Sequence, residues 1–137
     1  MIVADTSALL ALFNRREPAH AAVRAVVEAE AEPLIVSPFV VAELDYLVAT
    51  RLGVAAELAV LTELAGGAYH LASMPAEKLD RARSVVERYR DQGIGVADAS
   101  LVVLADQYQT RSVLTLDRRH FDALRPLDGG HFRILPA

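Results

Sequence analysis

Short apolar runs alternate along the 137-residue chain with longer segments in which apolar residues recur at helical spacing. A strand, helix, strand order of this kind places the strands in a parallel sheet with helices on both faces. The sequence therefore predicts an α/β fold, a three-layer α/β/α domain whose central, mainly parallel sheet has four to five strands. The runs expected as strands are residues 1–4, 34–36, 69–72, 112–116 and 132–135.

The helices are marked by start and stop signals as well as by periodicity. Proline in a first turn and glycine after a last turn are typical of helix ends, as at Pro38 and Gly53. The chain carries no repeat, linker or shift in composition, so a single domain over residues 1–137 is expected. The segments expected as helices are residues 8–13, 18–31, 38–51, 54–64, 75–92 and 96–108.

The composition excludes several classes of function. Fourteen basic residues against 18 acidic ones give a net charge of −4, which excludes a polybasic protein that coats nucleic acid by charge alone. The absence of cysteine excludes disulfides, thiolate zinc sites, iron–sulfur clusters and cysteine nucleophiles. No signal-like N-terminus and no run long enough to cross a membrane is present, so we expect a cytoplasmic protein without a membrane partner.

Two aspartates follow strands at the edge where ligands bind in open α/β sheets. Asp5 comes directly after the first expected strand, and Asp117 directly after the fourth. The carboxyl ends of parallel strands meet at one edge, so the two side chains are candidates for a shared site. For either residue alone, capping of the helix that follows is an equally good interpretation.

Two further carboxylates lie on helices among apolar neighbours. On a helical wheel Glu43 falls between Phe39, Val40 and Leu47, which places it on the predicted core face, whereas Asp45 points to solvent. No basic residue of that helix is placed to pair with Glu43, although a distant arginine remains an alternative. Asp98 lies in the first turn of an almost wholly apolar helix, where the helix dipole alone would favour it.

The four carboxylates have a joint explanation that their separate interpretations lack. Brought together without a counter-ion they repel one another and take up protons, whereas around a hard cation they stay ionised. An oxygen-only set of ligands favours Mg²⁺ or Mn²⁺ over zinc. Such sites serve phosphoryl chemistry, in which the metal activates water and stabilises the leaving oxygen. A metal site formed by Asp5, Glu43, Asp98 and Asp117 is therefore predicted.

Four segments in this order resemble the PIN-domain ribonucleases. They are the opening from Ile2 to Leu10, the helix from Ser37 to Leu44, the segment from Gly95 to Ala99 and the stretch from Val113 to Phe121. The resemblance covers essentially the whole chain, and its short single-domain length is similar to the VapC-type toxins of VapBC toxin–antitoxin pairs.

This resemblance implies a divalent-metal-dependent endoribonuclease. Asp5, Glu43, Asp98 and Asp117 would be the catalytic, metal-holding residues, with water attacking the phosphorus in line to leave a 5′-phosphate and a 3′-hydroxyl. Thr6 and Thr115 match the small hydroxyl residues beside the acids, and would orient carboxylates or water; a simple N-cap is the other interpretation of Thr6. The implied partners are RNA, a cognate antitoxin and a second copy of the chain in a homodimer.

The sequence also contains candidate contact surfaces. Two basic pairs flank the predicted acidic mouth and are suited to RNA phosphates, unless they are ordinary exposed arginines; these are Arg15, Arg16, Arg118 and Arg119. The four histidines show no metal-ligand spacing. Apolar residues on the helices between residues 38 and 64 are candidates for an antitoxin groove, or else form the core; these are Val40, Leu44, Leu47, Val48, Leu58 and Leu61.

Two other functions stay open at this point. The first is a catalytically silent PIN-like module that binds RNA or protein without turnover. The second is a phosphoacceptor signalling domain, which also uses clustered aspartates and Mg²⁺ on an α/β sheet. The second is disfavoured because Thr6 and Ser7 follow Asp5 where an acidic pair would be expected, and because Lys78, the one lysine, lies in a predicted surface helix.

Overall fold

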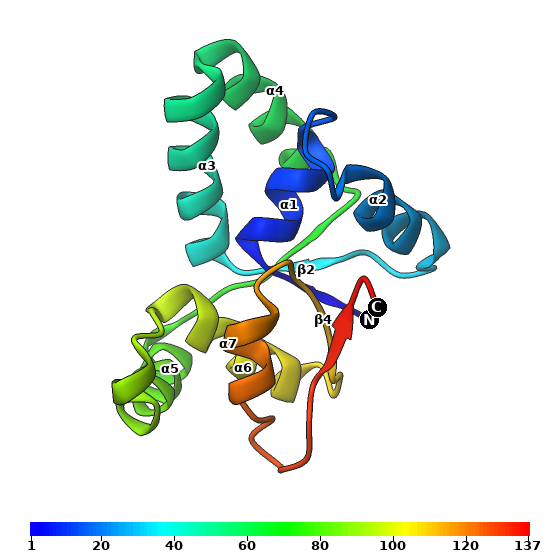
Figure 1. Ribbon diagram of the computed structural model, residues 1–137. Coiled ribbons are helices and arrows are strands. Elements are labelled where there is room, and N and C mark those ends of the chain that lie inside the picture. Colours follow the sequence, from blue (N-terminus) through cyan, green and yellow to red (C-terminus); the bar gives the residue numbers. More distant parts are fainter.

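The computed structural model describes residues 1–137 and confirms the three-layer α/β/α fold (Figure 1). Its five strands are all parallel and lie in the order β3-β2-β1-β4-β5. The strands are β1 (Val3–Ala4), β2 (Ile35–Val36), β3 (His70–Leu71), β4 (Ser112–Leu114) and β5 (Arg133–Leu135). The helices are α1 (Thr6–Phe13), α2 (His20–Ala29), α3 (Pro38–Leu52), α4 (Val54–Ala65), α5 (Ala76–Arg88), α6 (Val96–Gln107) and α7 (Arg118–Ala123), with a 3-10 turn, η1, at Arg90–Gln92.

Helices cover both faces of the sheet. In Figure 1, α1 to α4 lie above the sheet and α5 to α7 below it. Helix α6 runs beneath the centre of the sheet, and its residues 99–105 are all buried, as its apolar sequence predicts. Strand β1 is the middle strand, because Val3 pairs with Ile35 on one side and with Val113 on the other.

The strands are shorter than expected and one helix was not expected at all. The predicted strand over residues 112–116 ends at Leu114, and α2 begins at His20 rather than at Pro18 because residues 18 and 19 form a turn. Helix α7 has six residues, most of them charged or polar, so no hydrophobic periodicity marks it. It begins because the Asp117 side chain accepts a hydrogen bond from the His120 backbone N–H.

Helix α3 presents two different stripes to its surroundings. Val40, Leu44 and Val48, four residues apart, are completely buried in the core. The prediction that these three residues line an antitoxin groove is therefore wrong: they are core residues. On α4, Leu58 and Leu61 are exposed and stay available for a partner. No helix in the structure is both long and apolar enough to span a membrane.

Candidate active site

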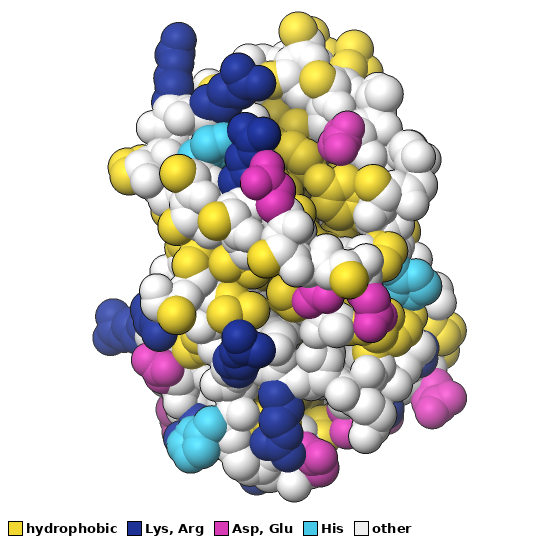
Figure 2. Space-filling model, turned by 90° about the vertical axis from the view of Figure 1, so that its right-hand side faces the viewer, with side chains coloured by type: hydrophobic (Ala, Val, Ile, Leu, Met, Phe, Trp, Pro, Cys, Tyr) yellow, Lys and Arg dark blue, Asp and Glu magenta, His cyan; other side chains and the backbone are white.

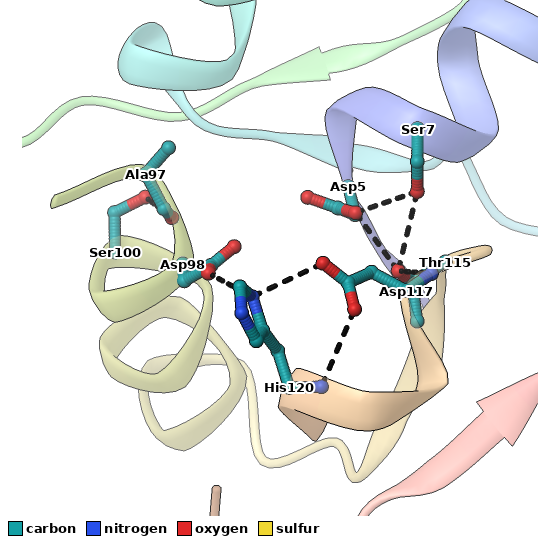
Figure 3. A network of polar contacts seen from close by, with 8 residues as sticks. All are labelled: Asp5, Ser7, Ala97, Asp98, Ser100, Thr115, Asp117 and His120. Carbon is teal, nitrogen blue, oxygen red and sulfur yellow. Dashed lines mark hydrogen bonds and ion pairs between the residues drawn. The ribbon is translucent and has the colours of Figure 1, made fainter. Parts of the chain in front are cut away.

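Asp5 directly follows β1, and two hydroxyl groups donate hydrogen bonds to its carboxylate. The Thr115 hydroxyl donates to Asp5 Oδ2 at 2.8 Å, and the Ser7 hydroxyl donates to the same oxygen at 2.7 Å. Asp5 occupies the N-cap position of α1, yet its side chain makes no capping hydrogen bond. Both hydrogen bonds fall on one oxygen, so the other faces the space between the helices (Figure 3). The capping interpretation of Asp5 is thus wrong.

The same hydroxyls tie β1 to the loop after β4. Thr115 Oγ1 accepts a hydrogen bond from the Asp117 backbone N–H at 2.9 Å, and Ser7 Oγ accepts one from the Leu116 N–H at 2.9 Å. The pairing of Ala4 with Leu114 sets this register, since it brings the next residues of both strands side by side. Sequence reasoning missed Ser7, although its spacing of two residues from Asp5 is suited to such a contact.

Asp98 and Asp117 meet on either side of one histidine ring. His120 Nδ1 lies 3.0 Å from Asp98 Oδ2 and 3.0 Å from Asp117 Oδ2 (Figure 3). Asp117 also caps α7, so its capping interpretation and its place in the site are compatible. The histidines lack metal-ligand spacing in the sequence, so that criterion gave no indication of this contact. The spacing of three residues between Asp117 and His120 on a helix was the available signal.

The charges at this site affect one another. Burial and, after it, the negative charges of Asp5 and Asp117 raise the pKa of the Asp98 carboxyl, and His120 lowers it; the net result is a pKa of about 6. Burial is the largest of these causes. The favourable effect of the helix dipole on a carboxylate in the first turn of α6 therefore does not compensate for the loss of hydration of Asp98. Asp5 and Asp117 are therefore each near enough to repel the charged form of Asp98.

Glu43 lies at the rim of this cluster and not in the core. The prediction that its carboxylate points into the core is wrong, because the side chain is exposed. The second stripe of α3 consists of Glu43 and the residues spaced four apart on either side of it, which are Phe39, Leu47 and Arg51. That stripe flanks the core stripe and lines the cavities beside α6. The helical wheel placed the centre of the buried face at Glu43, whereas in the structure the centre is Leu44, one residue later.

One cavity gathers the acidic residues. It has a volume of about 410 Å³, and its walls include Asp5, Glu43, Asp98, Asp117 and His120. Leu47 lines it as well, so this predicted antitoxin residue faces the acidic cavity.

Asp45, predicted to be solvated, is instead half-buried beside Glu57, and a hydrogen bond with Asp45 raises the pKa of the Glu57 carboxyl.

The basic residues divide between this cavity and other places. Arg51 lines the acidic cavity, and sequence reasoning missed it by finding no suitable basic residue on α3. Its spacing of eight residues from Glu43 places both on the same side of the helix. Arg15 lines a different cavity, and Arg118 donates a hydrogen bond to the Pro136 carbonyl at 2.9 Å. The side chains of Arg16 and Arg119 are exposed.

The donor set fits a hard divalent cation. Carboxylate oxygens are the ligands that Mg²⁺ and Mn²⁺ prefer, and the buried Thr6 hydroxyl beside them has no hydrogen-bond partner. Thr6 is the first residue of α1, so it is not an N-cap. No three acidic or histidine side chains are arranged to hold one ion in this structure, in which His120 contacts both Asp98 and Asp117.

Comparisons with known proteins identify the family of the chain. Residues 2–125 match the PIN domain family. The chain is 61% identical over 135 residues to Ribonuclease VapC26 of Mycobacterium tuberculosis, an alignment that covers 98% of this chain and 100% of that protein.

Solved structures share the fold. The crystal structure of VapC20 of Mycobacterium tuberculosis, a toxin that cleaves the sarcin-ricin loop, has a TM-score of 0.79 at 19% identity, over 85% of this chain and 90% of that one. VapBC2 of Rickettsia felis, bound to a DNA fragment from its promoter, has a TM-score of 0.69 at 15% identity, over 98% of both chains. With the near-complete match to Ribonuclease VapC26, the chain belongs to the PIN-domain family and, within it, to the VapC ribonucleases.

Proposed function

We propose that this protein is a divalent-metal-dependent endoribonuclease and the toxin of a VapBC toxin–antitoxin pair. The observation that carries the proposal is the group of three aspartates, Asp5, Asp98 and Asp117, on one cavity at the carboxyl edge of the sheet. Burial raises the pKa of Asp98, and the charges of Asp5 and Asp117 add to this rise, as expected for carboxylates gathered without a counter-ion. The 61% identity to Ribonuclease VapC26 supports the choice of RNA as substrate.

Each residue of the site would have a distinct role. Asp5, Asp98 and Asp117 would hold Mg²⁺ or Mn²⁺, and Glu43 at the rim would hold a second ion or orient the attacking water. When bound, such an ion lowers the pKa of water and neutralises charge on the phosphate. Ser7 and Thr115 hold one Asp5 oxygen, so the other keeps a fixed direction toward the cavity. The unpartnered Thr6 hydroxyl is available to orient water.

Arginines would supply the contacts to the RNA backbone. Apart from Arg51 and His120, the ionisable residues of the cavity wall are acidic, so phosphates would be held by cations at the rim. Arg51 and the exposed Arg119 are the residues best placed for this contact. Arg118 would join them only by giving up its hydrogen bond to the Pro136 carbonyl, while Arg15 and Arg16 lie beyond the far end of α1.

An antitoxin would bind at a second, more apolar cavity. This cavity of about 540 Å³ lies between α1, α2 and α4, and Leu12, Phe13, Leu52, Val60 and Tyr69 are among the residues of its wall. Figure 2 shows hydrophobic side chains gathered in a hollow on one face, with basic and acidic side chains beside it. Such a surface suits an amphipathic helix. The exposed Leu58 and Leu61 of α4 remain candidates for the same partner or for a homodimer contact.

The decisive experiment is cleavage of total cellular RNA by the purified protein with Mg²⁺, with Mn²⁺ and with EDTA. We expect discrete fragments that require metal and that disappear in Asp5→Asn and Asp98→Asn. Asp91→Asn is the matched control, because Asp91 is exposed, lies in η1 and does not line the acidic cavity. Metal binding without cleavage, by folded protein free of antitoxin, would instead identify a silent binding module.

A further inference from the structure

We propose that the cavity beside Phe39 binds one unstacked base of the RNA next to the bond that is cut, so that Phe39 is a specificity-determining residue. The proposal rests on the proposed ribonuclease function. It concerns a cavity of about 440 Å³ adjacent to the acidic one, between the start of α3 and the start of α6. Its wall consists of Phe39, Ala42, Glu43, Gly95, Val96, Ala97 and Asp98.

This cavity borders the acidic one. Glu43, Gly95 and Asp98 line both, so a group in the first cavity lies directly beside the carboxylates that would hold the metal. In RNA each phosphate joins two nucleotides, so the bases of these two nucleotides lie within one nucleotide of it. A scissile phosphate at Asp5, Asp98 and Asp117 therefore brings a neighbouring base to the mouth of the Phe39 cavity.

The chemistry of the wall favours a base over the RNA backbone. The wall holds no lysine, arginine or histidine, and its only charges are the carboxylates of Glu43 and Asp98, which repel phosphate. The remainder is apolar or backbone. A flat, neutral group with hydrogen-bond donors on its edge fits this combination, and single-stranded RNA offers such groups when its bases are splayed out.

Phe39 is an aromatic residue that the core does not use. Its ring is half-buried but is not among the side chains that pack against the buried core, unlike Phe13 and Tyr69. Val96, on the α6 side of the cavity, is 39% exposed although it begins a helix whose residues 99–105 are buried. Two apolar side chains left open on opposite walls beside an acidic site provide a platform on which a base can stack.

The two walls are fixed relative to each other by a buried chain of hydrogen bonds. The Ser37 and Ser100 hydroxyl oxygens lie 2.7 Å apart, and both residues are completely buried. Ser100 Oγ donates to the Ala97 carbonyl at 2.6 Å, so the hydroxyl of Ser37 must donate to Ser100 Oγ. Ser37 Oγ also accepts a hydrogen bond from the Phe39 N–H at 3.2 Å. The Phe39 and Ala97 backbones are thereby held together, and the cavity is formed before any ligand binds.

Gly95 keeps the shared boundary of the two cavities open. A Cβ atom built at Gly95 meets nothing within 4 Å, and its φ of −97° is one that any residue adopts. A larger residue here would occupy the cavity without straining the backbone. Gly95→Leu is therefore a second way to block the cavity, independent of Phe39.

The test uses a pool of short single-stranded RNAs of randomised sequence, cleaved with Mn²⁺ and sequenced at the product ends. The wild-type protein should prefer one base, or one size of base, at a position beside the cut. Phe39→Ala and Gly95→Leu should remove the preference at that same position, with kcat/KM for the preferred sequence reduced about 5- to 150-fold, whereas Phe39→Tyr should keep it. Tyr46→Ala is the matched control, an exposed aromatic of α3 outside both cavities.

A binding arm separates this proposal from the proposed function. In the Asp5→Asn background, fluorescence anisotropy compares a labelled RNA with the same backbone carrying one abasic nucleotide at successive positions. Removal of one particular base should weaken binding, and Phe39→Ala should erase that difference. Unchanged base preference in both variants, or affinity indifferent to abasic sites, would overturn the base pocket. Absence of cleavage with base-dependent binding retained would instead overturn the nuclease function alone.

Discussion

The Thr115 hydroxyl donates a 2.8 Å hydrogen bond to Asp5 Oδ2, and the two residues lie 110 positions apart in the sequence. Both are buried where the adjacent parallel strands β1 and β4 end. The same hydroxyl accepts a hydrogen bond from the Asp117 N–H. One side chain thus orients two of the acidic residues of the site.

Thr115→Val should reduce cleavage far more than it reduces stability. Valine has the shape of threonine but leaves Asp5 Oδ2 with only the Ser7 hydroxyl, so the carboxylate loses its fixed direction. We expect a loss of activity of about 10- to 100-fold, measured as kcat/KM on one RNA substrate. Thr62→Val is the control, because the exposed Thr62 bonds only to the Leu58 carbonyl of its own helix. Full activity in Thr115→Val would contradict the orienting role.

The metal-free protein should lose stability as the pH rises through the pKa of Asp98. That pKa is raised to about 6 from the ordinary value of 3.8, so the folded state binds the proton more tightly than the unfolded state does. The stabilisation from the protonated form is complete below about pH 4 and lost above about pH 6.

Comparison with Asp98→Asn isolates this effect. As the pH rises from about 4 to about 6, the free energy of unfolding of Asp98→Asn should increase relative to that of wild type by about 1 to 2 kcal/mol. This is less than the full pKa shift of Asp98 would give, because solvent screens the carboxyl. Urea unfolding in EDTA measures it. A pH-independent difference would show that burial does not destabilise the Asp98 charge.

His120→Ala should destabilise the metal-free protein more than the metal-loaded one. The ring lies 3.0 Å from both Asp98 and Asp117 and lowers the pKa of Asp98, so its removal leaves Asp98 without this partner and Asp117 with only the backbone N–H of residue 120. A loss of about 1 to 3 kcal/mol is expected in EDTA, and a smaller loss with saturating Mn²⁺. Thermal unfolding with and without the ion tests this, with the exposed His131→Ala as control. Equal losses in both conditions would contradict it.

The buried stripe of α3 should respond to truncation as a core does. Leu44→Ala removes a completely buried side chain and should cost about 2 to 5 kcal/mol of unfolding free energy. Leu58→Ala, at a side chain that is 59% exposed, should change it by less than about 0.5 kcal/mol. Chemical denaturation measures both variants. Similar small effects at the two positions would mean that Leu44 is not packed in the core.

Much of the fold and part of the site were predictable from local patterns. Alternating strands and helices determine a parallel sheet, and Asp5 and Asp117 follow strands that must end at the same edge. Asp98 could be found because a carboxylate stands out in an apolar helix. Short strands and the six-residue α7 could not be delimited, since elements of this length carry too little periodicity.

The tertiary structure decided which side of each helix faces the site. The sequence determined that α3 is amphipathic, but the packing of α1, α4 and α6 around it selected the Val40, Leu44, Val48 stripe as core and left Phe39, Glu43 and Arg51 to the cavities. Likewise, only folding brings His120 between Asp98 and Asp117, and Ser37 against Ser100. The physical reason is that hydrophobic periodicity records how apolar each face is, whereas neighbouring elements determine which face is covered.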